Sequence, residues 1–353
     1  MPSVIKPVQS PGPAARKNLA AALIGAGVCI FFLRSGFLYI FFLVPLGVVA
    51  FVNGYRSAWI AFVIAAALNL SLAISTALAV GSAAAGIFWD VLFFTAMALM
   101  FTWIAAPPPG FSQRLSGSVR LIAGSCIGAL LFTLLFFRAI ASPPFSEAVD
   151  SWISSFLSLY RSADSDVVQN AILDSITADL ILDTMKSIML RGGSLVSIIL
   201  LFFICRQFSL GLANLLQRLK GREVLKTGAL AAFHVYPAVI WVFSGSLFLV
   251  VLARISAFEV PEIILWNILI LCGILYLAQG LGILQFFLIR TSVSPMLRFF
   301  LLLLFFILIV SPVLNVIFVA GILLLGIAEN WAPLRAQKNN GPPSTPGAGD
   351  GES

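Results

Sequence analysis

Two residues of opposite charge lie within or beside long apolar stretches of this sequence. Asp90 follows Phe88-Trp89 near one end of an apolar run, and Arg34 lies in the short turn after the first run. Ionisable side chains at membrane depth are costly and are functional candidates by default. Asp90 is therefore a candidate contact for a solute or cation, and Arg34 a candidate contact for an anionic group. The alternatives are a carboxylate satisfied by neighbouring helices and an arginine that reaches the lipid headgroups.

Polar amides inside apolar runs form a second group of candidates. They are Asn69, Asn267, Gln279 and Gln285. Such amides often form hydrogen bonds between helices, and the other interpretation is that they line a polar cavity. We predict Asn267 and Gln279, together with Asp90 and Arg34, as substrate-binding residues. A glycine follows Gln279 directly, which permits close approach of another backbone.

Residues typical of catalysis and metal binding are scarce. The one histidine, His234, excludes a site built on two histidines, and GxSxG, HExxH and Walker motifs are absent. The four cysteines stand singly in apolar runs and are interpreted as small buried hydrophobic residues: Cys29, Cys126, Cys205 and Cys272. We predict no catalytic residue, no metal site and no cofactor.

The composition indicates what surrounds these residues. Of the 353 residues, 60% are hydrophobic and 10% are charged, whereas soluble proteins carry about 25% charged residues. So few charges cannot cover a surface that faces water, so the lipid bilayer is the expected solvent. The net charge of +7 arises from basic residues between the apolar runs. Orientation in a membrane explains that placement, and nucleic acid is not expected as a partner.

A helix that crosses about 30 Å of hydrocarbon needs about 20 residues. The sequence predicts an all-α transmembrane bundle of about ten spans (eight to ten): 18–33, 37–52, 57–80, 83–106, 119–140, 187–210, 234–254, 262–289, 297–310 and 313–328. Ser311-Pro312 separates the last two, and one kinked helix is the alternative there. A GxxxG pattern at Gly124 and Gly128 predicts tight helix packing within the chain.

Loop charge predicts how the helices are threaded. Basic short loops favour the cytoplasm, which places both termini and the basic 211–233 loop inside. Segment 143–185 is predicted outside, because it carries seven acidic residues against Arg161 alone. One face of a predicted amphipathic helix there is formed by Trp152, Ile153, Phe156, Leu157 and Tyr160. That helix either caps the bundle or lies on the membrane surface.

The predicted organisation has five parts. Residues 1–17 and 336–353 are cytoplasmic tails, disordered by composition. Residues 18–142 hold transmembrane helices 1–5, and residues 187–335 hold helices 6–10. Between them lies the extracytoplasmic acidic segment, 143–186.

Two stretches resemble a known family. The first runs from Phe41-Phe42-Leu43-Val44-Pro45-Leu46-Gly47 to Asn53-Gly54-Tyr55-Arg56, and the second runs from Asn267 to Leu281 and ends in Gly326–Arg335. Both resemble the YybS-like family of bacterial polytopic membrane proteins and, more faintly, the substrate-binding subunits of energy-coupling-factor vitamin transporters. The ending departs from the YybS-like pattern, because Glu329-Asn330 stands where an aspartate is expected. The resemblance implies a bacterial inner membrane protein, and the transporter likeness implies a small-solute site near the outer face.

These features together predict a transport-related membrane protein that binds a small solute, with a cytoplasmic or membrane protein partner at the basic 211–233 loop. Two alternatives stay open. One is a non-catalytic scaffold or subunit of an envelope complex, and the other is a membrane enzyme that acts on lipid-linked substrates.

Overall fold

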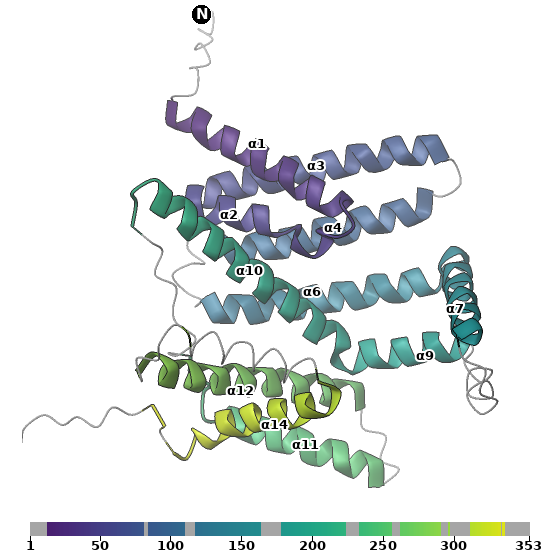
Figure 1. Cartoon of the computed structure of the whole chain (residues 1–353), viewed down its shortest axis with the longest axis vertical. Coiled ribbons are helices and arrows are strands. Elements are labelled where there is room, and N and C mark those ends of the chain that lie inside the picture. Colours follow the sequence, from purple (N-terminus) through teal and green to yellow (C-terminus); the bar gives the residue numbers. More distant parts are fainter. Residues whose placement is uncertain are drawn as a thin grey trace, which may run out of the picture. The chain divides into compact units, whose positions relative to one another are not determined.

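The structure, a computed structural model, describes residues 13–80, 84–109, 117–163, 178–223, 233–255, 262–290, 296, 311–332 and 334–335. All regular secondary structure in these ranges is helical (Figure 1), which confirms the all-α prediction. The chain divides into two compact units, Met1–Lys226 with Glu262–Asn267, and Thr227–Pro261 with Ile268–Ser353. The first unit thus includes the basic residues near position 220.

Four long apolar helices pack in sequence order in the first unit. They are α1 (Pro13–Arg34), α3 (Tyr55–Val80), α4 (Ala84–Ala105) and α6 (Gly117–Ile140). α1 packs on α3, α3 on α4, and α4 on α6. Ala58, Ala61 and Ala65 recur on one face of α3 and are fully buried. Small side chains on that face allow neighbouring backbones to approach closely.

Two short helices connect α1 to α3. They are the 3-10 turn η1 (Tyr39–Phe41) and α2 (Val44–Asn53), which ends at Gly54 with a φ of +82°. α2 is largely buried, and the Ser209 hydroxyl donates to its Val44 carbonyl at 3.0 Å. A Cβ added to Gly47 would overlap the Ser209 side chain, so glycine permits this close packing.

A break separates α9 (Ala178–Ile188) from α10 (Ser194–Leu219). Between them lies η2, a π-helical turn over Met189–Gly193, where Arg191 and Gly192 leave the helical conformation. Gly192 has a φ of +110°, which side-chain-bearing residues rarely adopt, so glycine defines the kink. α10 then packs along α2 and α6, and its Ser194 hydroxyl lies 2.8 Å from that of Thr133.

The GxxxG pattern packs helices together within the chain. A Cβ on Gly124 would lie 2.7 Å from the Ile104 side chain of α4, and one on Gly128 would lie 3.1 Å from Ile198 of α10. The two glycines therefore let α6 pack closely against two different helices, as predicted from their spacing.

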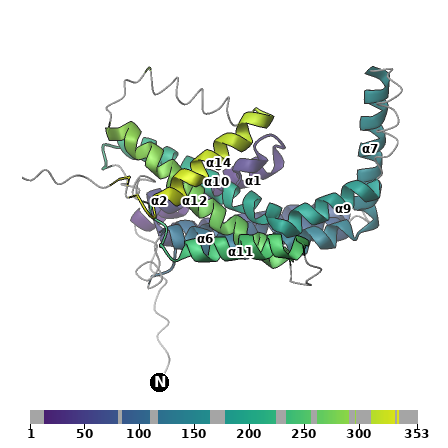
Figure 2. The ribbon, with the colours of Figure 1, turned by 90° about the horizontal axis from the view of Figure 1, so that it is seen from below.

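The acidic segment contains the predicted amphipathic helix, α7 (Pro143–Ala163). Ile153 is buried, whereas Trp152 and Phe156 are exposed and stack on each other. α7 contacts α6 and α9, and Figures 1 and 2 show it turned across their ends. Exposed aromatic rings favour the membrane-surface alternative over the cap, because such rings settle at headgroup depth. The predicted start of a second helix near Asp164 lies outside the described residues.

The second unit contains α11 (Val239–Ile255), most of α12 (Glu262–Arg290) and α14 (Pro312–Ala328). The backbones of α12 and α14 touch at two glycines. A Cβ on Gly280 would overlap the Ile322 carbonyl oxygen, and one on Gly326 would overlap that of Tyr276. The glycine after Gln279 thus has the packing role that the sequence suggested.

The prediction of about ten spans is not confirmed. In the described part of the chain, six helices are long and apolar enough to cross a membrane: α1, α3, α4, α6, the α9–α10 run and α12. The predicted span 37–52 is instead η1 followed by α2, whose ten residues extend only about 15 Å. α11 and α14 are shorter apolar helices of 17 residues each. The predicted span 297–310 lies outside the described residues, so the kinked-helix alternative is not tested.

The predicted 211–233 loop is partly wrong in its bounds. α10 continues to Leu219, so the first third of that stretch is helical, and the chain turns at Gly221 with a φ of +64°. The error arose because polar residues that project from a helix end have the composition of a loop. Arg218, Lys220 and Arg222 are exposed there.

Candidate functional site

A cavity of about 170 Å³ lies among the helices of the first unit. It is lined by Leu33 and Arg34 of α1, Tyr39 of η1, Asn69, Ala73 and Thr76 of α3, and Asp90, Val91 and Phe94 of α4. The structure therefore brings Arg34 and Asp90, two of the four predicted substrate-binding residues, to the walls of one cavity.

The end of α1 positions Arg34 at this cavity. The Ser35 hydroxyl donates to the Phe32 carbonyl at 2.9 Å and accepts from the Leu38 amide at 3.2 Å. Gly36 has a φ of +65°, which reverses the chain after α1. The reversal brings Tyr39 back to the end of α1, beside Arg34.

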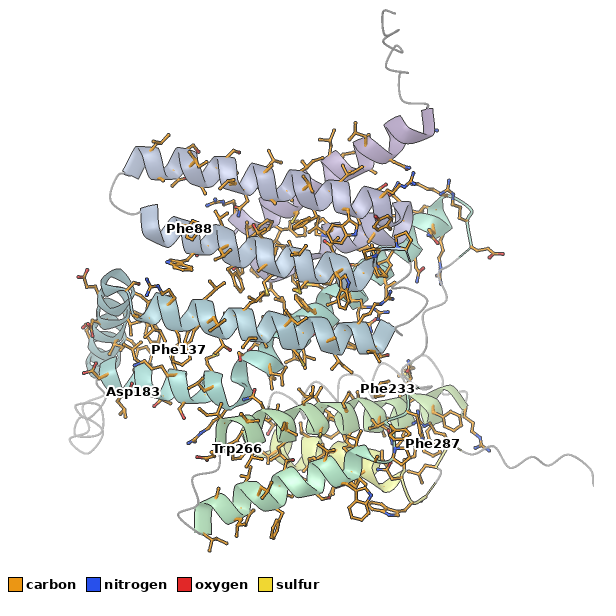
Figure 3. The ribbon with its side chains drawn as sticks, turned by 180° about the vertical axis from the view of Figure 1, so that it is seen from behind. Phe88, Phe137, Asp183, Phe233, Trp266 and Phe287 are labelled. Atoms are coloured by element: carbon orange, nitrogen blue, oxygen red, sulfur yellow. The ribbon has the colours of Figure 1, made fainter. Side chains whose placement is uncertain are left out.

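The first part of α4 positions Asp90, about 9 Å from the start of the helix. Figure 3 labels Phe88, two residues earlier, and so marks this end of α4. The neighbouring Trp89 points elsewhere, because its ring lies 5.9 Å from the Arg138 guanidinium of α6. Phe94, four residues after Asp90 on α4, is buried, and its ring centroid lies 5.5 Å from that of Phe42. The Phe94 ring gives the cavity an aromatic wall.

The two cavity charges do not neutralise each other by direct contact. Arg34 and Asp90 lie within electrostatic range. Among the described residues, however, neither side chain has an ion-pair partner within 4.0 Å or a hydrogen-bond partner. Opposite charges held apart around one cavity are both available to a guest that carries complementary groups.

Asn69 adds an uncharged polar group to the cavity lining. The residue is 3% exposed, and within the described ranges its amide has no hydrogen-bond partner. An amide at a cavity wall can bond to water or to a bound polar guest. One face of α3 carries Asn69, Ala73 and Thr76, which are spaced i, i+4 and i+7. This spacing of polar and small residues is the sequence signal that could have predicted that they line the same cavity.

The other two predicted substrate-binding residues do not line this cavity. Asn267 donates to the carbonyls of Leu190, at 2.6 Å, and Ile263, at 2.8 Å. Gln279 is fully buried in the second unit, where its amide accepts from the Val235 N–H at 2.6 Å and donates to the Gly326 carbonyl at 2.9 Å. These bonds correspond to the helix-packing alternative for polar amides.

A second polar cluster links the chain after α14 to the segment before α11 through hydrogen bonds and an ion pair. Glu329, with a side chain only 1% exposed, pairs with Arg335. Arg335 also donates to the Phe233 carbonyl at 2.8 Å and lies 2.9 Å from Nδ1 of His234. The sequence offered Glu329 only as a departure from a family pattern. Its partners lie six residues and about 100 residues away, so spacing alone could not reveal the cluster.

The helices and their surfaces define the class of the protein. Large apolar side chains are broadly exposed, including Leu78 at 81% and Trp241 at 78%, which is unfavourable in water and favourable in hydrocarbon. The chain is thus an α-helical membrane protein with a small polar cavity in its first unit. No protein family, curated protein or solved structure matches it. Within the described ranges, no cluster of three or more potential metal ligands occurs.

Proposed function

We propose that the chain binds a small zwitterionic solute in the cavity of its first unit, as part of a transport process. The observation that carries this proposal is the pair Arg34 and Asp90, held unbridged on the walls of one cavity. The guanidinium suits a carboxylate or other anionic group, and the Asp90 carboxylate suits an ammonium group. The amide of Asn69, which has no partner among the described residues, supplies a further hydrogen-bonding position.

The size and lining of the cavity restrict the solute. A volume of about 170 Å³ admits a molecule of amino-acid or betaine size, and the aromatic wall at Phe94 suits a short apolar portion. Guests that carry only one charge would leave the other cavity charge without a partner. Discrimination therefore rests on the simultaneous use of both charges.

The proposal includes a setting in the bacterial inner membrane with cytoplasmic termini, in keeping with the YybS-like resemblance and the loop charges. Movement of the solute would then need an ion gradient or a partner ATPase. The exposed Arg218, Lys220 and Arg222 after α10 form the basic surface on which we propose that a cytoplasmic partner docks.

The test is the thermal stability of the purified full chain in detergent, measured with zwitterionic, cationic and anionic solutes of matched size. A ligand present at 100 times its Kd stabilises the folded state by about 2.7 kcal/mol. We expect zwitterions to raise the melting temperature of wild type, and R34Q and D90N each to lose most of that response. D183N, which alters an exposed carboxylate on α9, is the control and keeps the full response.

N69L separates binding from folding. It replaces a cavity-lining amide that has no hydrogen-bond partner among the described residues. Its melting temperature without solute therefore equals or exceeds that of wild type, while its response to zwitterions falls. Failure of every tested zwitterion to stabilise well-folded wild type would refute the proposal. Unchanged cellular function in R34Q and D90N would instead favour the scaffold alternative.

A further inference from the structure

Two arginines face each other where α6 begins, and no acidic residue in the described ranges pairs with either of them. Arg120 lies in the first turn of α6, and Arg206 lies on α10, which packs against α6. A Cβ added to Gly117 would lie 3.8 Å from Nη2 of Arg120 and 3.7 Å from Nη2 of Arg206. The two guanidinium groups therefore flank one point at the start of α6, and their like charges repel each other.

Some donors of this arginine pair have no acceptor among the described residues. Nε and Nη1 of Arg120 are buried and have no hydrogen-bond partner. In the part of the chain that the structure describes, neither arginine has an ion-pair partner, and the side chain of Arg206 has no hydrogen-bond partner. Buried donors without acceptors are rare in folded proteins, because each one loses its bonds to water. An anion between the two guanidinium groups would accept from these Arg120 donors and offset the repulsion between Arg120 and Arg206.

The position and chemistry of the pair indicate which anion. Arg120 lies about 4.5 Å along the axis from the first residue of α6, so it lies near one end of a spanning helix rather than in the middle of the hydrocarbon. Guanidinium groups bind phosphate oxygens through paired hydrogen bonds.

We propose that Arg120 and Arg206 form a binding site for a phosphate-bearing anion at the start of α6. The site is separate from the cavity of Arg34 and Asp90 and does not depend on the function proposed for that cavity. At the end of a spanning helix, the phosphate of an anionic lipid headgroup and free phosphate share the required chemistry, since basic pockets between membrane helices bind such headgroups.

The test uses the purified, delipidated full chain with three probes: phosphatidylglycerol, phosphatidylcholine and inorganic phosphate. Binding is followed by native mass spectrometry and by melting temperature. We expect phosphatidylglycerol to bind wild type, and R120Q and R206Q each to bind it about tenfold more weakly, as for the loss of one charged hydrogen bond. R56Q is the matched control, because Arg56 is an exposed arginine in the first turn of another spanning helix, α3. It keeps wild-type binding.

The comparison of probes identifies the source of the anion. Stabilisation by phosphatidylglycerol but not by inorganic phosphate assigns a lipid, and equal stabilisation by both assigns a soluble phosphate compound. Without any anion, R120Q and R206Q melt no lower than wild type, because each substitution removes an unpaired charge. Equal binding of phosphatidylglycerol by wild type, R120Q, R206Q and R56Q would overturn the proposal. So would a lower melting temperature of R120Q in the absence of phosphate, which would show a purely structural role.

Discussion

Replacing Gly326 by alanine tests the close backbone contact between α12 and α14. A Cβ at Gly326 would overlap the carbonyl oxygen of Tyr276 and lie 3.0 Å from the backbone nitrogen of Gly280. These are backbone atoms, so no side-chain rotation relieves the overlap, and α12 and α14 must move apart. Since the Gly326 carbonyl accepts from Gln279, the same movement strains a buried hydrogen bond.

The expected loss follows from these contacts. Overpacking a well-packed interior typically costs about 1–3 kcal/mol, and leaving a buried amide unsatisfied costs about 1–3 kcal/mol more. Gly321, also on α14, has no heavy atom within 4 Å of its Cβ position. G321A is therefore the matched control, and it gains about 0.5–1 kcal/mol of helix stability.

The assay is unfolding of the purified protein by increasing SDS in mixed micelles, with the melting temperature as a second measure. G326A is expected to unfold at clearly lower SDS than wild type, and G321A at equal or higher SDS. G280A repeats the test from α12, since its Cβ would overlap the Ile322 carbonyl oxygen. If G326A and G321A were equally stable, the proposed backbone contact between α12 and α14 would be incorrect.

Two further predictions use the same assay. E329Q is expected to cost about 3–5 kcal/mol, because it removes the charge of the buried carboxylate that pairs with the largely buried Arg335, whereas the exposed pair of Lys186 and Asp183 contributes below about 1 kcal/mol. Equal effects of E329Q and D183N would contradict the burial of the Glu329 pair. Q279L leaves the Val235 N–H and the Gly326 carbonyl without their hydrogen-bond partner, and we expect a cost of about 1–3 kcal/mol for each group. A Q279L variant as stable as wild type would show that these bonds contribute nothing.

The apolar pattern of the sequence was sufficient to predict the helical class and most long helices, because burial in hydrocarbon requires long continuous apolar segments. It was not sufficient to count spans. The run at 37–52 is apolar enough for a span, yet the turn at Gly36 and the entry at Val44-Pro45 shorten it to α2. α2 is apolar because other helices bury it, and composition does not distinguish burial by protein from burial by lipid.

The cavity could be predicted in part. Arg34 and Asp90 stood out because each charge is costly beside an apolar run, and the structure places both in the lining of one cavity. Asn267 and Gln279 looked equivalent in sequence, but their amides bond to backbone groups on distant segments. The sequence did not indicate Arg120 as a binding residue, because membrane orientation already accounts for an arginine at the end of a span. Its proximity to Arg206 depends on how α6 and α10 pack, which the sequence does not show.

Helix lengths within the second unit differ in a way that involves the surrounding lipid. α12 has 29 residues, whereas α11 and α14 have 17 each, or about 44 Å against about 26 Å of axis. Hydrocarbon about 30 Å thick is too thin for an upright α12 and too thick for the two short helices. If all three cross the bilayer, the long helix must tilt and the membrane must thin beside the short ones, and each change affects the other. The geometry of this unit then depends on the acyl-chain length of the lipid as well as on the sequence.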